Sequence, residues 1–153
     1  MKRIEVKLAL PVVAPLLDVI RELADDLRKH LASPISIQDI DADFQEAWTN
    51  ELLASQAEEV KTLLALFNEE FFTEGVVAFD EANAETIVRA CAAVRLRLRD
   101  KYLKQLGDET LESGDLDLNA LEEPYRKAFM CYLFLATVQE LIIQHLDESI
   151  LGT

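Results

Sequence analysis

The chain has 153 residues, and its 29 acidic residues outnumber its 15 basic ones to give a net charge of -14. Half of the residues are apolar, so a chain of this length can bury most of the apolar surface that its unfolded form exposes. We therefore expect a single helical domain over residues 1–153, which excludes disorder for most of the chain. The strongly negative field repels duplex phosphate, so nucleic acid is excluded as a partner.

The same composition indicates how the protein associates with other proteins. An apolar-rich chain with this much surface charge can present an apolar face to a protein partner or to a second copy of itself. We therefore expect a homo-oligomer to be accessible to this chain, although repulsion between the like net charges opposes it.

Two apolar runs resemble segments that lie outside a folded core. Residues 1–24 have a basic start and the apolar run LALPVVAPLL, which is the outline of a signal peptide. Glu5 and Lys7 interrupt that outline, so we expect the segment to belong to the mature fold. The run FMCYLFLATV at residues 129–138 is roughly half the length that spans a bilayer, which predicts a core helix. We therefore expect no membrane partner and a cytoplasmic location.

Two short segments have the pattern of strands. Residues 3–8 alternate apolar and charged side chains, which is the period of a half-buried strand. Residues 75–79 form a second candidate, which ends at Asp80, a suitable N-cap for a helix. Together they predict a minor two-stranded element, which needs helices packed against it to be stable.

The rest of the chain is helical in pattern. Apolar residues recur at helical spacing after Pro11 and Pro15 until Ser33-Pro34 stops them. Further helices are expected at residues 41–53, 55–72, 80–106 and 123–146, the second of these after the capping-box pattern that begins at Ser55. Residues 107–119 hold two glycines and five acidic residues, which predicts an acidic loop within the domain. The predicted fold class is mainly α, a bundle of about five helices with the minor β element.

The segment IVRACAAVRLRLRDKYL, residues 87–103, places four arginines and a lysine in an otherwise acidic chain. Its RLRLR run alternates like a strand, but the whole segment carries an apolar stripe at helical spacing. That stripe consists of Ile87, Cys91, Val94 and Leu98. A second apolar strip on nearly the opposite side consists of Ala92, Leu96 and Leu103. The two strips predict a central helix that is covered on two faces.

The basic side chains of this segment admit two interpretations. Arg95 and Arg99 lie four apart along one seam of the helix, whereas Arg89 and Arg97 point elsewhere. An arginine at the edge of a central helix lays its stem on apolar surface and needs a carboxylate for its guanidinium. Internal pairing is the favoured interpretation, and the alternative is that Arg95, Arg99 and Lys101 bind an anionic ligand or a partner.

The run VVAFDEANAETIVRACAAVRLRLRDKYL resembles a bacterial, all-helical family catalogued as a domain of unknown function, serial two-zero-one-seven. Arg95 and Lys101 fall on the two arginines of the family pattern Leu-Asn-Asp-Leu-Arg-Leu-x-Leu-Gly-x-Arg-Leu. Ala92 and Ala93 replace its Asn-Asp pair, and Arg99 replaces its glycine. Residues 132–147 are also similar to the closing helix of the family. The resemblance implies a mainly helical bacterial protein with a link to protein turnover, since family genes often neighbour that of the ClpS proteolysis adaptor.

Motifs for catalysis, metals and cofactors are absent from the sequence. There is no Gly-x-Ser-x-Gly, no glycine-rich phosphate loop and no Glu-x-x-His pair for a di-iron bundle. Cys91 and Cys131 lie in apolar helical context, where a free thiol packs as a small hydrophobe. His30 and His145 are expected at solvated helix ends. We therefore expect no catalytic residue, no metal, no cofactor and no enzyme activity.

Two functions follow from these patterns. The first hypothesis is a non-enzymatic interaction or regulatory protein that acts through a helical surface or groove. The alternative is a sensor of a small anionic ligand, in which Arg95, Arg99 or Lys101 holds the ligand at the edge of a helical cavity. A hydrolase comes third, because paired carboxylates cannot be recognised in a sequence this acidic.

Overall fold

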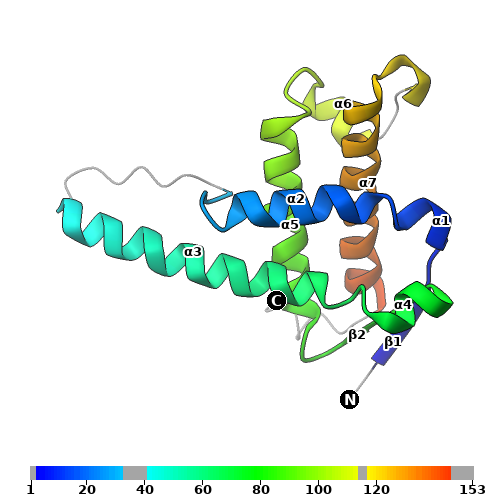
Figure 1. The fold of residues 1–153 in the computed structure, drawn as a ribbon, viewed down its shortest axis with the longest axis horizontal. Coiled ribbons are helices and arrows are strands. Elements are labelled where there is room, and N and C mark those ends of the chain that lie inside the picture. The colour runs from blue at the N-terminus through cyan, green and yellow to red at the C-terminus, as the bar shows by residue number, and fades with distance from the viewer. Residues whose placement is uncertain (1–2, 33–40, 114–116, 146–153) are drawn as a thin grey trace.

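The structure, a computed structural model, describes residues 3–32, 41–113 and 117–145 (Figure 1). Its elements in chain order are β1 Arg3–Lys7, α1 Leu10–Val13, α2 Leu16–Leu27, α3 Ala42–Leu64, α4 Glu69–Glu74, β2 Val76–Asp80, α5 Ala84–Lys101, α6 Asp108–Ser113, a short 3-10 helix Leu118–Ala120 and α7 Glu123–His145. The predicted fold class, mainly α with a minor two-stranded element, is confirmed.

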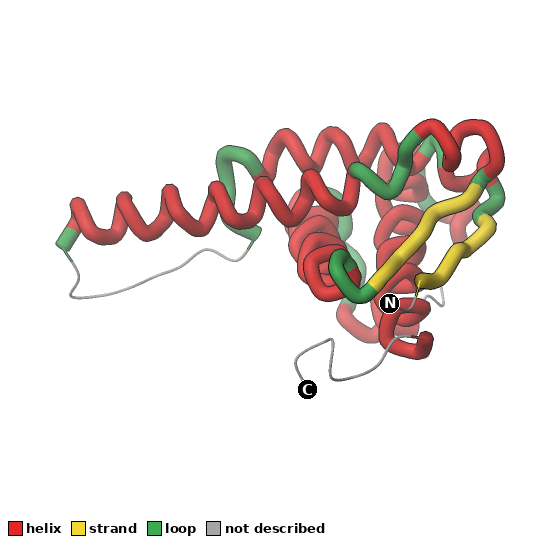
Figure 2. Tube along the Cα trace, turned by 90° about the horizontal axis from the view of Figure 1, so that it is seen from below, coloured by secondary structure: helices red, strands yellow, loops and turns green. Residues whose placement is uncertain are grey.

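The long helices form two crossing layers. Helices α5 and α7 lie side by side, and α2 and α3 run across them (Figures 1 and 2). Helix α5 packs against α3, α7 and α2, so the expectation that it is central is confirmed. Its predicted stripe of Ile87, Cys91, Val94 and Leu98 is fully buried. At roughly 1.5–3 kcal/mol for a large apolar side chain, such burial dominates the stability of the arrangement.

Helix α7 closes the core from the other side. It buries seven side chains, namely Ala128, Phe129, Cys131, Tyr132, Leu135, Val138 and Ile142. By length and composition it is also the one described helix that would pass as a membrane span. Its packing against α2 and α5 buries part of that apolar surface.

The two strands pair antiparallel beside α4, at one end of the helical layers (Figure 2). Ile4 lies opposite Phe79 and Val6 lies opposite Val77, so the apolar faces of both strands coincide. Gly75 ends α4 in the left-handed conformation, with φ of 73°. A Cβ atom at this position would lie 2.8 Å from the carbonyl oxygen of Leu8, so glycine is required for both reasons.

The prediction of separate helices at residues 41–53 and 55–72 is wrong. Residues 42–64 form the single helix α3, because neither glycine nor proline interrupts them, and Ser55 lies inside it. The break comes after Leu64 instead. There Asn68 caps α4, and its side-chain oxygen accepts the backbone N–H of Phe71 at 3.2 Å.

Other boundaries also differ from the expected ones. Helix α5 begins at Ala84, because the carboxylate of Asp80 accepts the N–H groups of Ala82 and Asn83 and so holds a turn after β2. The segment expected as an acidic loop contains α6 and the 3-10 helix, since Leu111 is 2% exposed and anchors it to the core. Its residues 114–116, the Ser33-Pro34 stop and Leu146 lie outside the described residues.

The C-terminal end of α2 is joined to α3 by one side chain. The amide nitrogen of Gln56 donates to the carbonyl oxygens of Leu27 at 2.7 Å and of His30 at 3.0 Å. Its amide oxygen accepts the backbone N–H of Ala32 at 3.0 Å. Gln56 thus satisfies backbone groups that the end of a helix leaves without partners, and it determines where α3 crosses α2.

Replacing Gln56 with alanine should therefore lower the free energy of unfolding by about 2 kcal/mol, because three backbone groups lose their partner at once. Chemical denaturation followed by circular dichroism measures this. The matched control is Gln144→Ala on α7, where the exposed side chain donates to Glu140 alone and a change below about 0.5 kcal/mol is expected. Equal effects of the two substitutions would contradict the role of Gln56.

Candidate functional site

One face of the central helix is open. The prediction that the strip of Ala92, Leu96 and Leu103 is covered holds at Leu103, which is fully buried, but is wrong at Leu96, which is 43% exposed. The reason is that α3 and α7 pack on flanking sides of α5 and leave this part of the strip between them. A large apolar side chain in the middle of the central helix therefore faces solvent.

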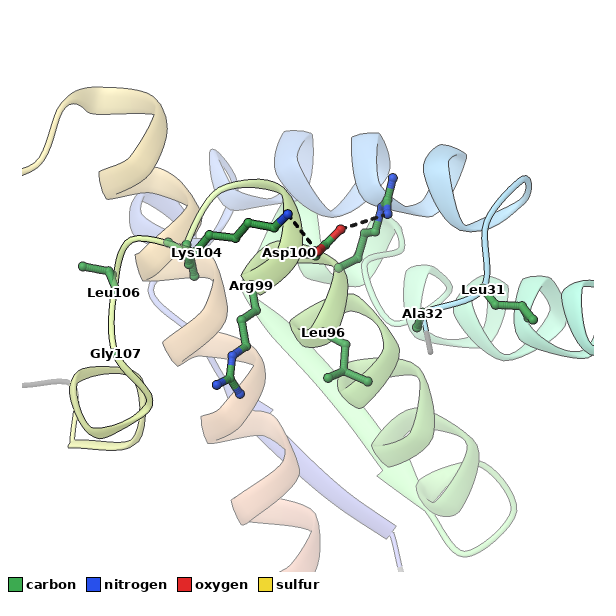
Figure 3. A pocket seen from close by; sticks show the side chains of 10 residues that line it. Leu31, Ala32, Leu96, Arg99, Asp100, Lys104, Leu106 and Gly107 are labelled. Atoms are coloured by element: carbon green, nitrogen blue, oxygen red, sulfur yellow. Dashed lines mark hydrogen bonds and ion pairs between the residues drawn. The ribbon is translucent and has the colours of Figure 1, made fainter. Parts of the chain in front are cut away.

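Three hollows adjoin Leu96, and each has this residue in its lining. Their volumes are about 660, 440 and 240 Å³. We call them together the Leu96 groove. Its apolar lining consists of Leu31, Ala32, Leu52, Ala92, Ala93, Leu96, Leu103 and Leu106. Figure 3 shows Leu96 and Arg99 projecting from the same side of α5, with Leu31 and Ala32 to one side and Leu106 and Gly107 to the other.

The groove is more basic than the rest of the chain. Its lining holds five cationic side chains, those of Arg89, Arg95, Arg97, Arg99 and Lys104. Glu59 and Asp100 are the two carboxylates among the lining residues. Carboxylates just outside it also pair with the cations, since Glu85 lies 2.6 Å from Arg89 and Asp26 lies 3.7 Å from Arg97. Among the described residues that line the groove, five cations thus accompany two carboxylates, in a chain of net charge -14.

Arg95 and Arg99, which the sequence placed on one seam, both line the smallest hollow of the groove. The carboxylate expected for Arg95 is replaced by other partners. Its guanidinium donates to the side-chain oxygen of Gln139 at 2.6 Å and lies 4.4 Å from the ring centre of Tyr132. An amide and an aromatic ring hold the guanidinium without neutralising it, so Arg95 keeps its positive charge at the groove.

Lys101 does not join them. Its ammonium group lies on the side of α5 that faces α2, 2.8 Å from Glu22 and 3.0 Å from Asp26. The hydroxyl of Tyr102 also donates to Glu22, at 2.6 Å. The hydrogen bond from Lys101 lowers the pKa of Glu22 and that of Asp26, while the bond to Glu22 raises the pKa of Lys101 and of Tyr102. Lys101 is thus a structural bridge between α5 and α2.

The N-terminal part of α3 extends past the end of α2 and away from the core (Figures 1 and 2). We call residues 41–55, which precede Gln56, the overhang. Its Phe44 is 58% exposed and its Trp48 is 38% exposed, and the two rings meet edge to face at 6.1 Å. The overhang carries four carboxylates and no basic residue. This exposed aromatic surface was not predicted from the sequence. A signal for it was present, because the apolar residues of the overhang are too sparse for a helix that is buried in the core.

Both cysteines lie in the core. Cys91 and Cys131 are fully buried free thiols, and burial raises the pKa of each to about 12. A thiol whose pKa is raised in this way is protonated at neutral pH, which disfavours attack by its sulfur as a nucleophile. His30 and His145 are exposed. No group of three or more His, Cys, Asp or Glu among the described residues could hold a metal ion.

The fold and this surface define a mainly helical domain with an open groove on its central helix. Residues 24–146 match the family described as Domain of unknown function (DUF2017), and the chain belongs to that family because the match covers most of it. No curated protein and no solved structure matches the chain. The family expected from the arginine segment is therefore confirmed, and it carries no assigned activity.

The bridge of Lys101 makes stability depend on pH. Because the pKa values of Glu22 and Asp26 are lowered from the usual 4.5 and 3.8, the stabilisation is full above about pH 5 and is lost as the pH falls. Lys101→Met should lower the free energy of unfolding by about 1 kcal/mol at neutral pH, since the partners are partly exposed. The difference from the unaltered protein should shrink as the pH falls below these usual values and through the lowered pKa values of the two carboxylates.

Denaturant midpoints across this pH range measure the effect. The matched control is Lys104→Met, because Lys104 is 73% exposed and faces one carboxylate, that of Asp100, at 3.4 Å. Its substitution should change stability little at any pH. A Lys101→Met effect that does not decrease at all down to the lowest pH at which the protein is folded would assign the loss to packing of the lysine stem instead of to the bridge.

Proposed function

We propose that this protein is a non-enzymatic interaction or regulatory protein and that its binding surface is the Leu96 groove. The observation that carries the proposal is the exposure of Leu96 at the centre of the groove, on the helix that otherwise organises the core. An apolar side chain at such a position gains free energy when an apolar partner group covers it.

The surroundings of Leu96 indicate the chemistry of the partner. The small side chains of Ala92 and Ala93 leave room for a partner side chain next to Leu96. The cations along the edge, among them Arg99 and Lys104, suit acidic groups that flank an apolar anchor. We therefore propose a partner segment that is amphipathic and acidic, such as a helix in a groove.

We also propose that the protein is cytoplasmic and that it is not an enzyme. Buried free thiols at Cys91 and Cys131 are typical of a reducing compartment, which supports a cytoplasmic location. The inertness of both thiols supports a role without covalent chemistry.

Substituting Leu96 with aspartate should abolish partner binding, since a carboxylate at the centre of the groove removes the apolar contact and repels acidic groups. Tagged protein is used to isolate partners from extract of the host at low and at moderate salt, with quantitative mass spectrometry of the bound proteins. The matched control is Ile143→Asp on α7, because Ile143 is 52% exposed and lies outside the lining of the groove. A partner that binds both variants equally would contradict the groove as the binding surface.

A second candidate function has one observation in its favour. The hollow of about 240 Å³ has the side chains of Arg95, Arg99 and Tyr132 in its lining, and two guanidinium groups in one hollow suit a small anionic ligand. Lys101 has no part in this version, because it is held at α2.

If the protein is such a sensor, an anionic metabolite should raise the melting temperature. A ligand at a hundred times its dissociation constant stabilises by about 2.7 kcal/mol, which corresponds to a shift of several degrees. A thermal-shift panel of phosphates, sulfate and dicarboxylates measures this, with Arg95→Gln as the variant that should lose the shift. Lys104→Gln, which removes a cation outside this hollow, is the control. No shift with any member of the panel would contradict the sensor.

A further inference from the structure

The overhang has the apolar and acidic side chains that suit the Leu96 groove. Phe44 and Trp48 supply a large exposed apolar surface on one side of the helix. Four carboxylates accompany them, those of Asp41, Asp43, Glu46 and Glu51, and no cation lies between them. The overhang is therefore an acidic amphipathic helix, which is the partner chemistry proposed for the groove.

The outer part of the overhang, which carries Phe44 and Trp48, cannot reach the groove of its own molecule. Helix α3 runs without glycine or proline from Ala42 to Leu64, and Gln56 holds its middle against the end of α2. A continuous helix fixed at that point cannot bend back onto α5. The groove that Phe44 and Trp48 can enter is therefore one on another molecule.

We propose that two copies of this chain associate by placing the overhang of each in the Leu96 groove of the other. This inference rests on the proposed function, because it names a second copy as an occupant of the same groove. The contact is reciprocal, so a two-fold axis relates the copies and the assembly closes as a dimer.

The geometry of one molecule suits this exchange. Leu52 and Ser55, at the base of the overhang, line the groove of their own molecule. The overhang thus begins at one groove and leads outward from it. The 14 residues of α3 from Ala42 to Ser55 extend about 21 Å at 1.5 Å per residue, so two antiparallel α3 helices bring each Trp48 toward the opposite groove.

Charge favours contact between an overhang and a groove over direct contact between two overhangs. Direct contact between two overhangs would bring eight carboxylates together without a cation, four from each copy. Contact between an overhang and a groove instead brings carboxylates to a lining whose described residues include five cations and two carboxylates. Like charges in direct contact are destabilising, whereas the overhang and groove are complementary.

Sedimentation velocity of the full chain over a wide concentration range tests the dimer, with charge-reversed variants on each side of the contact. Glu46→Lys with Glu51→Lys reverses the overhang, and Arg99→Glu with Lys104→Glu reverses the groove. Each pair should weaken the dimer on the order of tenfold or more. An equimolar mixture of the two variants should recover it, because both contacts of the mixed dimer are then complementary.

The matched control is Glu69→Lys with Glu70→Lys, which makes the same change of charge on exposed positions of α4. It should leave the dimer intact. Circular dichroism and thermal midpoints of every variant separate loss of association from loss of the fold.

Trp48 supplies an independent readout, because it is the one tryptophan of the chain. Its fluorescence emission should move to longer wavelength on dilution as the dimer dissociates and the indole returns to water. In the groove-reversed variant the emission should be at the longer wavelength at every concentration.

The outcomes distinguish this inference from the proposed function. A wild-type protein that is monomeric throughout, with Trp48 emission unchanged by dilution, overturns the dimer. The groove then stands as a site for another protein if Leu96→Asp still loses its partner, and both ideas fail if it does not. A dimer that survives both charge reversals, or variants that do not recover when mixed, would assign association to another surface and equally overturn the inference.

Discussion

The buried stripe of α5 determines the direction of every other side chain on that helix. Each residue turns about 100°, so burying Ile87, Cys91, Val94 and Leu98 against the neighbouring helices leaves no freedom elsewhere. Leu96 and Arg99 are carried to the open side, while Lys101 is carried to α2, where two carboxylates receive it. The groove and the bridge thus have one cause, which is the burial of the stripe.

The overhang has a different origin. A helix of 23 residues is longer than the core can cover, and nothing in its sequence stops it early. Asp41 caps its N-terminus by accepting the backbone N–H of Asp43, and acidic side chains in the first turn suit the helix dipole. Local interactions therefore extend the helix into solvent, although an uncovered helix of this length is marginal in water. An apolar surface is exposed as a result.

Sequence periodicity was sufficient for the buried side of the fold. Alternation placed β1, and helical spacing placed the stripe of α5, because burial repeats at local intervals. The open side of α5 could not be predicted in this way. Spacing indicates that Leu96 lies on an apolar strip, but it does not indicate whether another helix covers that strip. The partner of Arg95 is 44 positions away at Gln139, and no local pattern specifies so distant a contact. The boundary drawn at Ser55 failed because a capping pattern can also lie within a helix.

The side chain of Gln56 fixes the position of α3 where it crosses α2. It holds α3 at one point, and the same amide holds Ala32, whose neighbour Leu31 lines the groove with it. The position of α3 and the wall of the groove therefore depend on the same three hydrogen bonds of Gln56.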